Sequence, residues 1–179
     1  MTRPFIRAAV SIAALATVLT LGACGRSMDK ASMDKAMDEF QASQDAAAAQ
    51  TIKAGQDFLA RTAKEPGVVT LPSGLMYKVV SSPNPSAAKP SPNAKVKINY
   101  EGKLVSGEVF DSSYGRGAPA EFPLAGLVPA WQTALPMMHK GDTWMLYVPA
   151  SLGYGSADMG PIPPNSVLVF KIELIDFQN

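Results

Sequence analysis

The chain has 179 residues and a formal net charge of +1, from 16 basic and 15 acidic residues, with one histidine and one cysteine. This length suits one ordinary domain with short appendages. The near-neutral balance excludes the strongly basic surface that binds nucleic acid or anionic membranes, so we expect no nucleic-acid partner. A single cysteine excludes an internal disulfide, so the core must hold the fold alone.

Residues 1–24 differ in composition from the rest of the chain. Two arginines give a positive start to an apolar, uncharged run that is too short for a comfortable membrane span. The run ends in Leu21-Gly22-Ala23-Cys24, which resembles a bacterial lipoprotein cleavage box. We expect 1–23 to be a signal peptide and Cys24 to be acylated as the new N-terminus. The alternative is a plain secretory signal with an incidental cysteine.

If the chain is cleaved before Cys24, we expect the mature protein to be lipid-anchored in the periplasm. Gly25 follows the cysteine where an aspartate retention signal would stand. By resemblance to lipoprotein sorting rules, this favours the outer membrane. Cleavage also removes two arginines, which leaves 14 basic against 15 acidic residues and a net charge of −1.

The next segment, 24–66, is polar and alanine-rich and is predicted to be helical. Met33, Met37 and Phe40 are spaced as one face of a helix. Ser27 or Ser32 is a candidate cap at its start.

The helix is expected to stop at Glu65-Pro66-Gly67. Its apolar stripe is too thin for a helix that is stable alone. Two roles are open, a spacer that lifts the following domain off the membrane or a seam that joins a homodimer. The missing heptad pattern favours the spacer.

Strands and turns dominate 67–179. Val96, Ile98 and Tyr100 alternate with polar residues, which predicts a half-buried strand. Similar patterns predict strands at 144–148 and over 168–174.

Loops and one short helix separate these strands. Four prolines make 81–94 a loop, and Ser106-Gly107 predicts a hairpin turn. Trp131, Leu135 and Met138 are spaced as one face of a short helix. The sequence therefore predicts an α+β domain with one helix packed on an antiparallel sheet.

Five segments carry a resemblance to a known family. They are Val109-Phe110-Asp111-Ser112-Ser113, Leu127-Val128-Pro129-Ala130-Trp131, Gly153-Tyr154-Gly155, Ile162-Pro163-Pro164 and Leu168-Val169-Phe170. In this order they resemble the FK506-binding protein (FKBP) family of peptidyl-prolyl isomerases, and 68–79 resembles the domain entry of its Mip and FkpA branch. The resemblance implies a bent antiparallel sheet wrapped around one short helix, preceded by a helical segment. It also implies an isomerase, or rotamase, that assists folding of envelope proteins.

The resemblance also implies a site that grips proline. Asp111, Tyr154, Phe110 and Trp131 would be catalytic, and Tyr100, Leu127, Val128, Ile162, Phe170 and Phe122 would bind substrate. Trp131 would form the floor, Tyr154 would point its hydroxyl at the substrate carbonyl, and Asp111 would lie at the rim. The expected partners are proline-containing polypeptides and ligands such as FK506 or rapamycin. Taken singly, these aromatic residues would be ordinary core residues, so the prediction depends on the ordered set.

The match has departures. Ala120 stands where the family usually has an aromatic residue, Ala130 replaces a usual glycine, and Met159-Gly160-Pro161 differs from the common loop. These departures bear on FK506 affinity and substrate preference.

Other chemistries find little support in the sequence. His139 lies in a turn signal and is expected to be a solvated loop residue, so no metal site is predicted. No cofactor is expected either. The alternatives to catalysis are a chaperone or peptide-binding module that uses the same pocket, and an anchored scaffold that needs no pocket.

Overall fold

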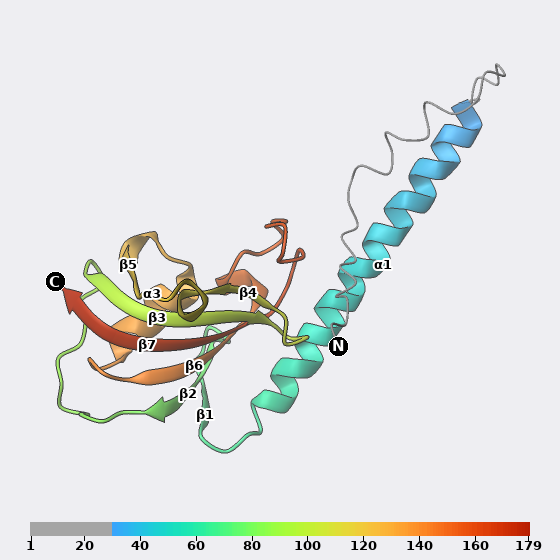
Figure 1. The fold of residues 1–179 in the computed structure, drawn as a ribbon. Coiled ribbons are helices and arrows are strands. Elements are labelled where there is room, and N and C mark those ends of the chain that lie inside the picture. Colours follow the sequence, from blue (N-terminus) through green and yellow to red (C-terminus); the bar gives the residue numbers. More distant parts are fainter. Residues whose placement is uncertain (1–29) are drawn as a thin grey trace, which may run out of the picture. The chain divides into compact units, whose positions relative to one another are not determined.

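The structure, a computed structural model, describes residues 30–179. The chain divides into two units, Met1–Phe40 and Gln41–Asn179. Helix α1 (Lys30–Thr62) begins in the first unit and ends in the second (Figure 1). The predicted cleavage box, the acylated Cys24 and the candidate cap Ser27 lie outside the described residues.

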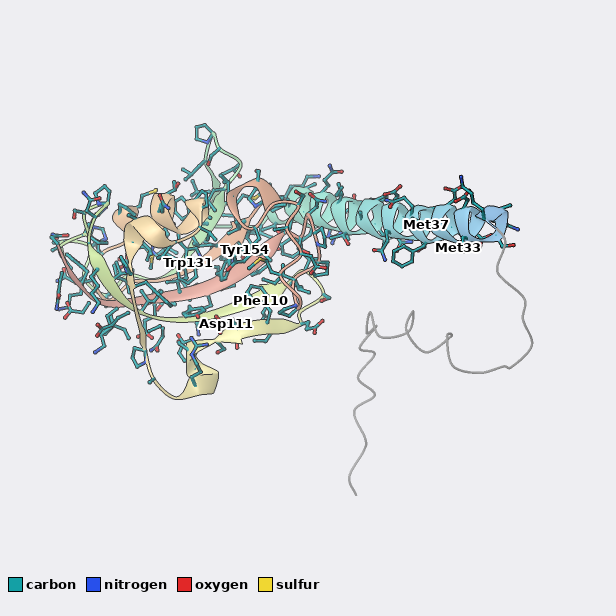
Figure 2. All side chains as sticks on the ribbon, turned by 90° about the horizontal axis from the view of Figure 1, so that it is seen from above. Met33, Met37, Phe110, Asp111, Trp131 and Tyr154 are labelled. Atoms are coloured by element: carbon teal, nitrogen blue, oxygen red, sulfur yellow. The ribbon has the colours of Figure 1, made fainter. Side chains whose placement is uncertain are left out.

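Helix α1 confirms the predicted helical segment. Met33, Met37 and Phe40 are 52%, 68% and 60% exposed, so the apolar stripe lies at the surface; Figure 2 labels the two methionines. Ser32 lies within the helix, which already includes Lys30, so its prediction as the cap was wrong. The helix ends at Thr62, just before the predicted stop.

The second unit, Gln41–Asn179, is called the compact unit below, and it is built on an antiparallel sheet. Its strands among the described residues are β1 (Val68–Thr70), β2 (Met76–Ser81), β3 (Lys95–Leu104), β4 (Val109–Ser112), β5 (Ala120–Pro123), β6 (Thr143–Val148) and β7 (Leu168–Gln178). They lie in the order β1-β2-β6-β7-β3-β4, and β5 also pairs with β3. Figure 1 shows β3 and β7 curving along their length. The predicted strands, the loop between β2 and β3 and the hairpin turn between β3 and β4 are confirmed.

The chain leaves the sheet between β4 and β5, and this gap positions the site. Strand β3 pairs with β5 through Ile98 and with β4 from Glu101 onward. The N–H of Tyr100, which lies in the gap, donates to Oγ of the fully buried Ser113 at 2.8 Å. Ser112 caps the intervening helix α2 (Ser113–Arg116) by accepting from the Gly115 N–H. The two serines thus close the gap and hold Tyr100 in place.

Helix α3 (Pro129–Ala134) packs on the sheet, followed by a 3₁₀ turn (Leu135–Met137). Proline suits the first position of a helix, because an N–H there would have no intrahelical acceptor and proline lacks that N–H. Trp131, Leu135 and Met138 are at most 4% exposed, which confirms the predicted buried face. They join one core with residues of β3, β6 and β7. The predicted α+β class, with a sheet wrapped around one short helix, is confirmed.

His139 lies in a loop, as predicted, but it is less exposed to solvent than expected. Its side chain is only 21% exposed, and Nδ1 lies 3.5 Å from Oδ2 of Asp142, which is 1% exposed. The same carboxylate accepts from the His139 N–H at 2.9 Å and from Nε1 of Trp144 at 3.2 Å. A turn sequence indicates where the chain bends, but the packing of Trp144 decided that this turn lies against the core.

Candidate active site

A cavity of about 320 Å³ opens on the compact unit between β3, β4, β5, β7 and the start of α3. Its walls are formed by Tyr100, Phe110, Asp111, Phe122, Gly126, Leu127, Val128, Trp131, Tyr154 and Phe170. Nine of the ten side chains predicted for the site therefore meet around one cavity. Figure 2 labels four of them on the sticks.

The floor is a group of aromatic rings packed edge to face. The ring centroids of Trp131 lie 5.2 Å from Tyr100 and 5.1 Å from Phe170, with interplanar angles of 77° and 85°. Phe110 meets Phe170 in the same way at 5.7 Å and 88°. Such pairs contribute about 0.5–1.5 kcal/mol beyond their area burial. The floor is therefore a closely packed aromatic surface.

Gly102 allows two of these rings to approach β3. A Cβ at this position would lie 2.6 Å from the Phe110 ring and 2.8 Å from the Phe170 ring. Any side chain would therefore displace both rings. Only the absence of a side chain lets the aromatic wall lie directly on the strand.

Asp111 belongs to a hydrogen-bonded triad at the rim. The Tyr100 hydroxyl donates to its carboxylate, and the Arg116 guanidinium forms an ion pair with it. Arg116 also donates to the Tyr100 oxygen at 2.8 Å, which closes the triad. Because Arg116 neutralises the single carboxylate at the cavity, the wall is polar only at its edge.

The triad shifts the pKa values of its members. Burial raises the pKa of Asp111, but hydrogen bonds from Tyr100 and Arg116 lower it more, so the net pKa lies below its ordinary value. Burial, followed by the bond to Asp111, raises the pKa of Tyr100. The carboxylate thus stays ionised and the phenol protonated across physiological pH.

Tyr154 lies at the mouth of the cavity and is 36% exposed. Burial, followed by the negative charge of Asp111, raises the pKa of its hydroxyl. The hydroxyl therefore remains a hydrogen-bond donor across physiological pH.

The segment before α3 is fixed by Gln132, which the sequence analysis did not single out. Its Nε2 donates to the carbonyl of Leu127 at 2.6 Å and of Ala125 at 3.1 Å. These bonds hold the backbone that leads into Val128, the residue that precedes α3.

The structure separates one predicted residue from the others. Ile162 is 5% exposed and belongs to the core, but it does not line the cavity. Ala120 is half-buried in β5 and also lies off the wall, where Phe122 provides an aromatic ring instead. Arg116 and Gly126 were not predicted. A basic residue five positions after Asp111 was the only available signal, and it equally describes a surface arginine.

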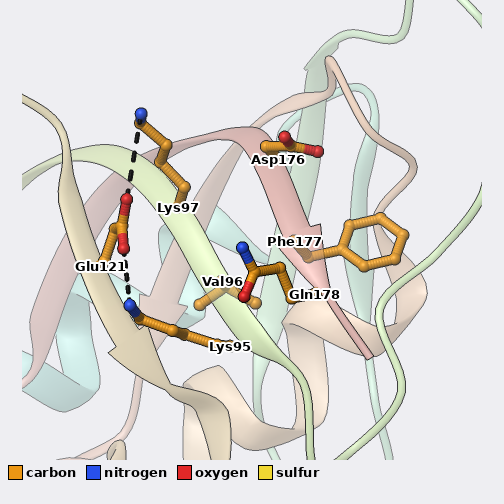
Figure 3. A pocket seen from close by; sticks show the side chains of 7 residues that line it. All are labelled: Lys95, Val96, Lys97, Glu121, Asp176, Phe177 and Gln178. Carbon is orange, nitrogen blue, oxygen red and sulfur yellow. Dashed lines mark ion pairs between the residues drawn. The ribbon is translucent and has the colours of Figure 1, made fainter.

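A second hollow, of about 150 Å³, lies at the other end of β3 (Figure 3). Glu121 there pairs with Lys95 at 2.7 Å and with Lys97 at 3.9 Å. These side chains are roughly half exposed, and the two lysines share the one carboxylate of Glu121. Exposed pairs of this kind add little binding energy, so the aromatic cavity is the candidate site. Within residues 30–179, no cluster of histidine, cysteine, aspartate and glutamate suits a metal ion.

Comparison with known families agrees with this geometry. The profile described as "FKBP-type peptidyl-prolyl cis-trans isomerase" matches residues 86–175. The chain belongs to this family. The profile of the domain amino-terminal to FKBP-type peptidyl-prolyl isomerases matches residues 6–79.

Relatives of this FKBP-type chain carry names from the branch inferred above. Peptidyl-prolyl cis-trans isomerase Mip of Coxiella burnetii is 47% identical over 119 residues, which cover 66% of this chain and 51% of that protein. Outer membrane protein MIP of Legionella longbeachae is 44% identical over 122 residues, covering 68% and 52%. The crystal structure of FkpA from Escherichia coli superposes with a TM-score of 0.73 at 35% identity, covering 84% of this chain and 74% of that one. The chain thus spans about half the length of the curated relatives it matches.

Proposed function

We propose that this protein accelerates cis–trans isomerisation of X-Pro bonds during folding of envelope proteins. One observation carries the proposal: an aromatic cavity whose single carboxylate is ion-paired with Arg116. The uncatalysed reaction has a barrier of about 18–20 kcal/mol because twisting the amide removes its resonance. The twisted amide is less polar than the planar one, so an apolar wall stabilises it selectively.

Each group has a role in this proposal. Trp131, Phe110 and Phe170 hold the proline ring against the cavity floor. The Tyr154 hydroxyl and the Val128 N–H donate to peptide carbonyls and orient the chain. Asp111 holds the Tyr100 ring in place. No bond breaks and no proton moves, which fits a site without a free acid or base.

A protease-coupled assay of residues 24–179 on a short Leu-Pro peptide, with and without FK506, tests the proposal. We expect catalysis that FK506 blocks. Catalysis without inhibition would mean that the cavity isomerises proline but does not bind the drug. A folded protein without catalysis would refute the enzyme and favour a chaperone or peptide-binding module.

Changing Tyr154 to phenylalanine is expected to lower kcat/KM by about twofold to fivefold, because one hydrogen bond to the carbonyl is lost while the ring remains. The same assay measures it. Tyr114→Phe removes a hydroxyl outside the cavity and provides the control. An unchanged rate in Tyr154→Phe would remove its proposed role.

The proposed location is the periplasmic face of the outer membrane, with Cys24 as the lipid anchor. The cleavage box and the printed name of the Legionella longbeachae relative support it. Within residues 30–179, no helix has the length and apolar character needed to span a bilayer.

Cys24→Ser is therefore expected to move the protein from the membrane fraction to the soluble fraction, because the acylated thiol is lost. Fractionation of cells followed by immunoblotting measures the change. Ser27→Ala, three residues on, provides the control. A serine variant that still sediments with membranes would contradict the anchor.

The proposed domain bounds are 1–23 for the signal peptide, 24–66 for the helical spacer and 67–179 for the FKBP-type domain. A homodimer through α1 is the alternative to a spacer, and the exposed Met33, Met37 and Phe40 support it. Sedimentation equilibrium of residues 24–179 separates the two, because a monomer mass supports only the spacer.

A further inference from the structure

The second half of α1 lies against the compact unit. Gly55 and Thr62 are its buried residues, and the Phe58 ring lies 6.1 Å from the Tyr147 ring. Residues 55, 58 and 62 share one helical face, at spacings of three and four. Gly55 on this face meets Val167, the residue just before β7.

Gly55 packs closely against Val167. A Cβ on Gly55 would lie 2.7 Å from Cγ2 of Val167, which is itself only 6% exposed. Glycine is the poorest helix former after proline, so its position in a helix interior is costly. The contact with Val167 gives a reason for it, because only glycine lets the helix backbone lie this close.

Val167 ends the loop that carries Tyr154. Two residues earlier, Asn165 adopts a left-handed conformation with φ of 61°, and its N–H donates to the Gly155 carbonyl at 2.7 Å. The next hydrogen bond joins the Ala157 N–H to the Tyr154 carbonyl at 3.2 Å. The segment that ends at Val167 is thus joined to Tyr154 through the Asn165–Gly155 bond, because Gly155 is the next residue in the chain after Tyr154.

We propose that Gly55 and Val167 are positioning residues, through which α1 holds the 153–167 loop and sets the place of Tyr154 at the cavity. The proposal rests on the proposed isomerase function. It makes the end of α1 part of the working enzyme rather than only a spacer. The proposed reaction depends on the Tyr154 hydroxyl being placed to donate to the substrate carbonyl, so a small shift of the loop is sufficient to slow it.

The test enlarges the side chain at position 55 and reduces the one at position 167, in a protein of residues 24–179. Gly55→Ala is expected to lower kcat/KM about threefold to tenfold, although alanine favours the helix. Val167→Ala removes the methyl groups that the new Cβ would meet, so Gly55→Ala with Val167→Ala is expected to recover most of the activity. Gln56→Ala, at an exposed neighbouring position, is the control and should match the parent.

Hydrogen exchange of the Asn165 amide gives a readout that does not need catalysis. Gly55→Ala is expected to speed exchange at Asn165, and the double variant is expected to slow it again. Unchanged rates and unchanged exchange in Gly55→Ala would overturn the inference, as would a loss that Val167→Ala does not reverse. A parent protein without activity would refute the proposed function, and the exchange data alone would then decide on the contact.

Discussion

Phe110→Ala is expected to lower kcat/KM by about tenfold to a hundredfold, because it removes one wall of the cavity that holds proline. The Phe110 ring lies edge to face against Phe170 and directly over Gly102. No neighbour can replace it without shifting the floor, so water would enter beside the substrate amide and the advantage of the less polar twisted form would fall.

The measurement is kcat/KM on the Leu-Pro peptide together with thermal unfolding. Phe110 is half-buried, so its loss should cost less than the about 3–5 kcal/mol of a fully buried phenylalanine. Val109→Ala is the matched control, because Val109 precedes it on β4 and is 46% exposed. Equal rates in the two variants would contradict the assignment of Phe110 to the site.

Asp111→Ala is expected to lower kcat/KM by about tenfold, because it releases two groups at once. Tyr100 loses the acceptor of its hydroxyl, and Arg116 loses its counter-charge beside an apolar cavity. If the carboxylate acts by holding these two groups, Arg116→Ala should give a similar loss. The double variant should then fall little below either single one.

Glu121→Ala provides the control, since Glu121 is also an ion-paired acid but lies at the charged hollow of Figure 3. Full activity of Asp111→Ala would contradict the role of the triad.

The lowered pKa of Asp111 adds a pH test. Its stabilising contribution is present above the ordinary value of 3.8 and is lost as pH falls through the lowered pKa, so the parent and Asp111→Asn should differ in thermal stability at pH 7 and converge at low pH.

Local sequence patterns were sufficient to predict helices and strands of this fold. The alternation of Val96, Ile98 and Tyr100 predicted β3, and the spacing of Trp131, Leu135 and Met138 predicted the buried face formed by α3 and the 3₁₀ turn that follows it. Side-chain period is a property of a short stretch of chain, so it can be read without knowing what the stretch packs against. Ser32 was predicted as a helix cap because serine is common at that position, and nothing local distinguishes a serine inside a helix from one that caps it.

The ordered motifs also determined which aromatic residues would meet. Phe110, Trp131, Tyr154 and Phe170 were selected together, and they line one cavity. What the sequence by itself determined was therefore the class of fold, the family and most of the cavity wall, because each is encoded in local spacing or in the order of short segments.

Only the tertiary structure decided the partners of these residues. It paired Arg116 with Asp111, placed the half-buried His139 beside Asp142, kept Ile162 off the cavity wall and set Gly55 of α1 against Val167. Each of these results depends on how separately formed elements pack, and a one-residue change in sheet register or a small rotation of a helix would alter it. Spacing along the chain carries no record of that packing, which arises only when the core closes around α3.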